Sequence, residues 1–192
     1  ISPIPDRLLP SRPDESYIVS MQYTDQAFLD HIPDVLRQRP DVRVILLEGK
    51  GLSRNRNHCL DASSADIALI ADDDCRYREE YIDRIFATFK ESPHTDIALF
   101  RINGEGRVST KRYPSTVCPY EKRPKGYSPS SIEIAFRPDR LRAIRFDEHF
   151  GLGSDFLLCG EEEVWIHDAM KAGLRVCFFP CDIVDYPYES TG

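Results

Sequence analysis

The stretch that decides the fold is Ile-Ala-Leu-Ile-Ala-Asp-Asp-Asp, residues 67–74, in which five apolar residues lead directly into three aspartates. An unbroken apolar run of this length predicts a strand buried on both faces of a sheet. Three adjacent carboxylates repel one another, so a cation or hydrogen-bond donors must compensate them. Divalent metals such as Mg²⁺ and Mn²⁺ prefer such oxygen ligands. The alternative interpretation is a solvated acidic turn.

Outward from this stretch, apolar strand-like runs alternate with segments of helical periodicity. We expect strands at 17–21, 42–47, 67–71, 97–102, 132–137 and 174–179, and helices at 28–37, 53–62, 79–90 and 161–172. This alternation predicts an α/β fold with a doubly wound, mainly parallel (mixed) sheet flanked by helices. Ligands of such sheets bind at the carboxyl ends of the strands, where residues 72–74 stand.

Local signals set the ends of the expected helices. Ser53 is a plausible N-cap for the helix at 53–62, and Pro93 ends the helix at 79–90. Gly173 takes the C′ position of the helix at 161–172. The last strand should end at Pro180, because proline lacks the N–H of a ladder residue.

Composition narrows the classes of protein. The chain has 192 residues, 41% of them hydrophobic and 30% charged, which suits one core and one domain over 1–192. A net charge of -7 excludes nucleic acid as the main partner, and no apolar run reaches the roughly 20 residues of a transmembrane helix. The chain opens at Ile1 without methionine and closes at Gly192 without a terminal signature. We therefore expect a piece of a longer protein that is truncated at the N-terminus, and truncation at the C-terminus is compatible with the sequence.

Two further features concern the cysteines and a basic segment. The six cysteines show no metal-ligand or CxxC spacing, so we expect reduced thiols in a cytoplasmic protein. Residues 104–131 lack periodicity and are rich in basic side chains, which is typical of a functional lid or binding loop. The basic residues are Arg107, Lys111, Arg112, Lys122, Arg123 and Lys125.

Residues 67–81 resemble the strand, Asp-x-Asp motif and following helix of family 2 glycosyltransferases, which have the GT-A fold. In that family the first aspartate contacts the nucleotide-sugar and the second binds the metal that bridges its diphosphate. The resemblance therefore implies that Asp72 and Asp74 are metal ligands for Mn²⁺ or Mg²⁺. It also implies that Asp72 contacts the donor, and it places Asp73 beside that donor.

The upstream segment 51–57, Gly-Leu-Ser-Arg-Asn-Arg-Asn, resembles the family's Gly-x-x-x-x-Arg-Asn segment. Arg56 and Asn57 match its last two residues. A helix start with guanidinium groups suits phosphate or nucleobase contacts, so Arg54, Arg56 and Asn57 are candidate substrate-binding residues. Without the spacing to Asp72, the arginines would be interpreted as solvated helix residues. The family's uracil-reading aspartate has no clear counterpart in residues 20–25, which leaves the base open.

The run Gly160-Glu161-Glu162-Glu163 resembles the family's Gly-Glu-Asp motif at a helix start. In an inverting transfer a general base removes the acceptor proton. The resemblance implies Glu162 for this base, with Glu161 and Glu163 as competing candidates. Acidic residues in a first helical turn are also favoured by the macrodipole alone.

Two other residues complete the candidate site. Trp165 could stack on an acceptor sugar, although a lone tryptophan on a helix is more often part of the core. Asp185 lies where family members often place a third metal ligand, commonly histidine.

The resemblance implies metal-dependent, inverting transfer of a hexose from a UDP-hexose type donor to a glycan or lipid-linked acceptor. It implies a cytoplasmic role in polysaccharide biosynthesis, and peripheral association with the inner face of the membrane is compatible with it. One rival class, a nucleotidyltransferase that makes sugar nucleotides, would need a glycine-rich phosphate loop near the amino end, which we do not find. The second rival class is a catalytically silent carbohydrate-binding domain. Sugar, acceptor and stereochemistry stay open at this stage.

Overall fold

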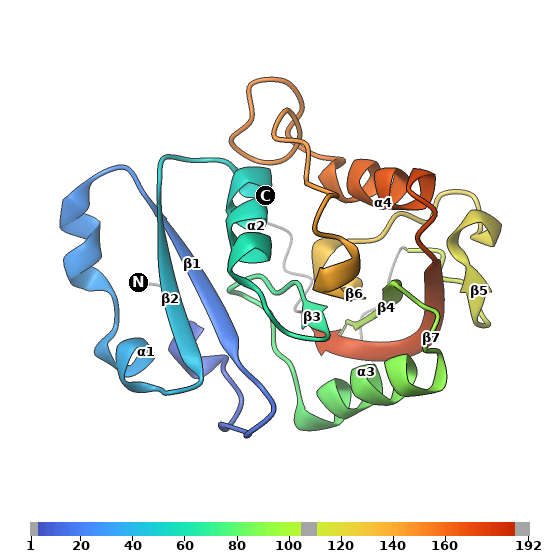
Figure 1. The fold of residues 1–192 in the computed structure, drawn as a ribbon, viewed down its shortest axis with the longest axis horizontal. Helices are drawn as coiled ribbons and strands as arrows, with labels where there is room; N and C mark the ends of the chain where they lie inside the picture. The colour runs from blue at the N-terminus through green and yellow to red at the C-terminus, as the bar shows by residue number, and fades with distance from the viewer. Residues whose placement is uncertain (1–3, 105–110, 187–192) are drawn as a thin grey trace.

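The structure is a computed structural model that describes residues 4–104 and 111–186. A small parallel sheet pairs β1 (Tyr17–Tyr23) with β2 (Val42–Glu48). Helix α2 (Leu52–Ala62) stands between this sheet and a second, five-stranded sheet (Figure 1). The short elements outside the two sheets are 3₁₀ helices at Ile4–Asp6, Gln26–His31, Tyr120–Lys122, Ser131–Glu133 and Pro138–Arg140, and helix α1 at Asp34–Gln38.

The second sheet has the strand order β3-β6-β4-β7-β5. Strand β6 (Ile134–Phe136) runs antiparallel to both β3 (Ala68–Leu69) and β4 (Ile97–Asn103), β4 runs parallel to β7 (Val176–Asp185), and β5 (Cys118–Pro119) runs antiparallel to β7. Strands β3, β4 and β7 therefore share one direction, and their carboxyl ends meet at one edge. The predicted mixed α/β fold is confirmed, with fewer parallel pairs than expected because β6 is inserted between β3 and β4.

Helices cover both faces of this sheet. Figure 1 shows α3 (Glu79–Glu91) on one face and α4 (Glu161–Lys171) on the other. Alternate residues of β4 separate the two cores, since Ile97 and Leu99 pack with α4 while Ala98 and Phe100 pack with α3. The buried, uninterrupted apolar pattern predicted for this strand is the pattern of a strand with helices on both sides.

Three local predictions between residues 28 and 53 were wrong. The helix expected over 28–37 is divided at Pro33, because proline removes a backbone donor and limits the preceding residue. The strand expected over 42–47 is only half-buried, since among residues 4–104 and 111–186 β2 pairs only with β1, and Leu46 is 42% exposed. The N-cap of α2 is Gly51, and the hydroxyl of Ser53 instead donates to the carbonyl of Phe150 at 2.6 Å.

The last strand is longer than predicted. It continues through Pro180 to Asp185, and its register against β4 shifts between Leu99 and Arg101. Proline is accommodated where a bulge interrupts the ladder, because its missing N–H has no partner to lose. The strand thereby brings Asp185 to the edge where the other parallel strands end.

The prediction for the end of α4 is confirmed. Gly173 follows the α4 C-cap with a φ of 86°. All six cysteines are free. Among the helices of residues 4–104 and 111–186, none is long and apolar enough to cross a bilayer.

Candidate active site

The three aspartates form an exposed turn at the carboxyl end of β3. The Ser131 hydroxyl donates to Asp72 Oδ2 at 3.4 Å. Surrounding protein limits the hydration of the Asp72 carboxyl and raises its pKa, with Asp74 and Asp73 adding to the effect and Arg56 opposing it. The turn is therefore a place where negative charge is crowded and a cation would be stabilised.

The same negative field acts on the residue behind the turn. Burial, followed by the charges of Asp72 and Asp74, raises the pKa of the Cys75 thiol to about 12. Cys75 is therefore protonated and inert at neutral pH, in agreement with a structural thiol.

Asp185 lies on the same edge but is committed to protein partners. Its carboxylate accepts hydrogen bonds from Arg78 Nε at 2.6 Å, Tyr81 Oη at 2.8 Å and Asn103 Nδ2 at 2.6 Å. Burial opposes its ionisation, but these three donors outweigh burial and hold the pKa of Asp185 below its usual range. Both carboxylate oxygens accept hydrogen bonds from protein donors, and the role of Asp185 as a third metal ligand stays a prediction. Asp185 joins the ends of β4 and β7 to α3.

The glutamate run stands at the start of α4. Gly160 adopts the left-handed conformation with a φ of 93°, which turns the chain into the helix. Arg56 Nη1 donates to Glu161 Oε1 at 2.9 Å and to Glu162 Oε1 at 3.1 Å. Glu163 points elsewhere, with its side chain 38% exposed and 3.5 Å from Arg123 Nη2.

The two glutamates on Arg56 differ in exposure. Glu161 is 4% exposed and its Oε2 has no hydrogen-bond partner among the described residues, whereas Glu162 is partly exposed. Burial raises the pKa of Glu162, Arg56 lowers it, and the charge of Glu161 raises it again. A carboxylate that is partly exposed and has a raised pKa is suited to accept a proton.

Arg56 connects the two acidic segments. It bonds to both Glu161 and Glu162 at the start of α4, and its charge lowers the pKa of Asp72 in the turn after β3. The fold therefore brings two segments that are 90 residues apart in the sequence within electrostatic range of one arginine. The structure thus pairs Arg56 with Glu161 and Glu162 and places Asp72 within range of its charge.

The other two candidates on α2 lie differently. Asn57 is buried, and its amide exchanges hydrogen bonds with the backbone of Phe146 and also donates to Glu148 Oε1 at 3.2 Å. Arg54 is exposed, and its guanidinium lies beside Gly49. Asn57 therefore anchors the loop that leads to α4, and Arg54 is open to solvent at the start of α2.

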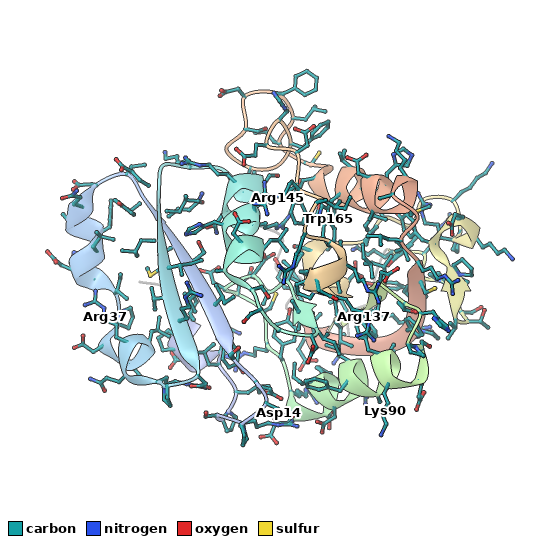
Figure 2. The ribbon with its side chains drawn as sticks, viewed as in Figure 1. Asp14, Arg37, Lys90, Arg137, Arg145 and Trp165 are labelled. Carbon is teal, nitrogen blue, oxygen red and sulfur yellow. The ribbon has the colours of Figure 1, made fainter. Side chains whose placement is uncertain are left out.

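The prediction that Trp165 binds substrate was wrong. Its side chain is fully buried, stacks on Phe146 with ring centres 4.7 Å apart, and donates to the carbonyl of Ile144. Figure 2 shows it between α4 and the sheet, and its ring also meets Phe136 edge-on. No face of the indole is left for a sugar.

Glu133, a fully buried glutamate two residues after Ser131, was not predicted from the sequence. It accepts hydrogen bonds from Lys111 Nζ at 2.6 Å, from the Tyr113 hydroxyl and from the backbone N–H of Ser130. Ser130 and Glu133 form a capping box, a Ser-x-x-Glu pattern that the sequence displays and that could have been recognised. Lys111, predicted to belong to a basic lid, is directed inward to this carboxylate.

The rest of that predicted basic segment is only partly described. Arg107 and its neighbours at 105–110 lie outside the described residues. Arg123 packs over the Tyr120 ring at 3.8 Å, and Arg112 is exposed. The lid role of the segment stays a prediction.

The residues of the acidic turn fit a divalent cation. Within residues 4–104 and 111–186, no three histidine, cysteine, aspartate or glutamate side chains form a preassembled metal cluster. Mg²⁺ is commonly bound through one or two carboxylates together with substrate phosphates, and such a site is completed only by the substrate. Exposed oxygen donors in crowded negative charge, as at Asp72 and Asp74, are the donor set that Mn²⁺ and Mg²⁺ prefer.

Solved structures share this arrangement of strands and helices. The crystal structure of S. aureus TarS 1–349 is similar with a TM-score of 0.67 and 20% identity, over 91% of this chain and 51% of that one. Its complex with UDP-GlcNAc gives the same TM-score and identity over 93% of this chain. Glucosyl-3-phosphoglycerate synthase from Mycobacterium tuberculosis matches with a TM-score of 0.52 and 14% identity, over 91% of this chain and 73% of that one. The chain thus spans about half the length of the TarS structures.

Together these features define an α/β domain with the GT-A fold. Residues 20–157 match the model of glycosyl transferase family 2, and the chain belongs to that family. The resemblance found in the sequence is thereby confirmed. A search of curated proteins finds no match.

Proposed function

We propose that this chain is a glycosyltransferase catalytic domain, spanning 1–192, that transfers a sugar from a nucleoside-diphosphate sugar to an acceptor hydroxyl. The observation that carries the proposal is the position of Arg56, which bonds to Glu162 at 3.1 Å and whose charge lowers the pKa of Asp72. A diphosphate leaving group needs a cation to neutralise its charge, and an acceptor hydroxyl needs a base to take its proton, so two separate carboxylate groups serve one reaction. The family membership supports the same reaction.

The turn after β3 is proposed to receive the donor. Asp72 and Asp74 would hold Mn²⁺ or Mg²⁺, and Asp73 would lie beside the nucleotide. When bound, such an ion neutralises charge on the diphosphate leaving group. Because the three aspartates are exposed, the diphosphate can reach them from solvent without rearrangement of the core.

Glu162 is proposed as the general base of a single displacement that inverts configuration. Its carboxylate takes the proton of the acceptor O–H while the acceptor oxygen forms a bond to C1 of the sugar. The bond from C1 to the phosphate oxygen breaks, and its electron pair leaves with the nucleoside diphosphate. Glu161, bonded to the same arginine and more deeply buried, is less accessible to an acceptor.

The donor class is proposed to be a UDP-hexose. TarS is described in complex with UDP-GlcNAc, and the mycobacterial synthase in complex with Mn²⁺ and UDP-Glc. A glycan or lipid-linked acceptor, a role in polysaccharide biosynthesis, and a cytoplasmic place with peripheral association at the inner membrane face complete the proposal.

The proposal is tested by screening UDP-glucose, UDP-N-acetylglucosamine and other nucleotide sugars for Mn²⁺-dependent binding and for slow release of UDP with water as acceptor. We expect at least one donor to bind, and Asp74→Ala to abolish metal-dependent binding and UDP release. Asp66→Ala, which removes an exposed carboxylate before the same strand, is the matched control and should behave as wild type. Absence of binding to every donor would favour a silent carbohydrate-binding domain, and unchanged activity of Asp74→Ala would contradict the role of the turn.

A further inference from the structure

Arg56 is the cation at the centre of the candidate site, and its surroundings point to a role different from the donor contact that the family motif implies. We infer that Arg56 is a positioning residue, which clamps Glu161 and thereby fixes Glu162 as the base that faces the acceptor. The inference rests on the proposed function and deepens it by separating the three glutamates of the α4 start.

The guanidinium of Arg56 is enclosed by the protein. Arg56 is 8% exposed, its Nη1 donates to Glu161 and Glu162 together, and its Cζ lies 5.4 Å from the centre of the Phe146 ring. Phe146 is itself buried and stacked on Trp165, so this support is rigid. Nη1 is committed to the two glutamates, and removing those carboxylates would leave a buried charge unpaired, which is strongly unfavourable.

Glu161 is wedged in place and has no freedom to act on an acceptor. A Cβ added to Gly151 would lie 3.2 Å from Glu161 Cδ and 3.1 Å from Ser53 Oγ, so the carboxyl packs directly against the glycine backbone. On its other side is Arg56, at 2.9 Å. Glu161 is thus a brace between the loop before α4 and helix α2.

Glu162 also bonds to Arg56, but it is less buried than Glu161. It is bonded to the same nitrogen at 3.1 Å but stays partly exposed, so one carboxylate edge is fixed and the other can meet an acceptor. Adjacent carboxylates in a first helical turn repel each other, and Arg56 offsets that repulsion. Without Arg56, Glu162 would lose both its orientation and its compensating charge.

The test uses Arg56→Met and Arg56→Lys, with UDP release from the UDP-sugar that wild type uses, Mn²⁺ present and water as acceptor. We expect kcat of Arg56→Met to fall about 10- to 100-fold, the scale of a misplaced catalytic group, while KM for the donor changes less than about 3-fold. Arg56→Lys should keep more activity, because one ammonium can bond both carboxylates. Added guanidinium at a non-denaturing concentration should restore part of the activity of Arg56→Met. The matched control is Arg39→Met, which breaks an arginine–carboxylate pair with Asp41 outside the site.

A double variant distinguishes positioning from general damage. If Arg56 acts through Glu162, Arg56→Met in a Glu162→Gln background lowers kcat no further, because residues that act as one unit are not additive. An equal further drop in that background overturns the inference, and so does a large rise in donor KM with kcat unchanged, which would make Arg56 a donor ligand. Both results leave the proposed function standing. Wild-type protein that releases no UDP from any donor overturns the proposed function and this inference with it.

Discussion

The molecule carries two acidic segments of equal formal charge in opposite settings. Asp72, Asp73 and Asp74 are exposed after β3, whereas Glu161 is buried and shares Arg56 with Glu162 at the start of α4. The first segment is suited to a cation that arrives and leaves. The second has its cation built into the fold.

This difference separates two tasks that three carboxylates can perform. A group that binds an exchangeable metal must keep oxygen atoms free, because the metal supplies most of the stabilisation. A group that accepts a proton at a fixed atom must be held in one orientation, which a buried and packed arginine provides. Charge alone does not distinguish the two, but the surroundings of the carboxylates do.

The largest expected effect comes from the braced segment. Glu162→Gln should lower kcat for UDP release about 10²- to 10⁴-fold, the usual contribution of a general base, and should leave donor affinity nearly unchanged. Glu163→Gln changes the adjacent carboxylate, which pairs with Arg123 away from the site, and should retain most activity. Steady-state kinetics with both variants decides the matter. Loss of activity in Glu163→Gln alone would transfer the base to that residue.

A second, smaller effect concerns stability at the edge of the exposed segment. Asp185→Asn weakens three hydrogen bonds to a buried carboxylate and should lower the free energy of unfolding by about 1–3 kcal/mol, with Mn²⁺ affinity unchanged. Because the pKa of Asp185 is lowered in the folded state, its stabilisation is present above the usual aspartate pKa and is lost as the pH falls through its folded pKa. Urea denaturation at neutral and acid pH measures both. Weaker Mn²⁺ binding with unchanged stability would instead identify Asp185 as a metal ligand.

The smallest effect is a displacement of the pH profile. The pKa of Glu162 is raised from its ordinary value of 4.5, and the base must be ionised, so kcat should rise with pH through a midpoint above 4.5. Its effect on stability has the opposite sign, since ionising a group of raised pKa disfavours the folded state as the pH increases. Arg56→Met should move the midpoint upward, because Arg56 lowers this pKa. A midpoint that stays in place would show that another group controls the profile.

The elements around the motifs could be predicted because their signals are local. Helix α3 follows from its apolar periodicity and β4 from its unbroken apolar run. Strand β3 is only two residues long, since the chain before Asp72 meets β6 at just two positions, and pairing of that kind depends on a distant segment. The insertion of β6 between β3 and β4 has no sequence signal either.

The sequence indicated the acidic residues of the candidate site but not the residues that they contact. Motif spacing indicated Asp72 and Glu162, but the burial of Trp165 and the donors around Asp185 arise from contacts between segments 21 to 107 residues apart. Arg56 shows the limit most clearly. The motif identified the residue, and only the fold showed that its nearest partners are two glutamates more than 100 positions away.

The irregularity of β7 has a consequence for how this edge of the sheet could change over time. Six steps along β4, from Ile97 to Asn103, are matched by nine along β7, from Val176 to Asp185. The three additional residues of β7 shift its register against β4 and so determine which residue pairs with Asn103. Lengthening or shortening that stretch would present a different side chain there while the paired segments before it stay as they are. A single strand can in this way vary the side chains at one edge of the sheet while the rest of the fold is unchanged.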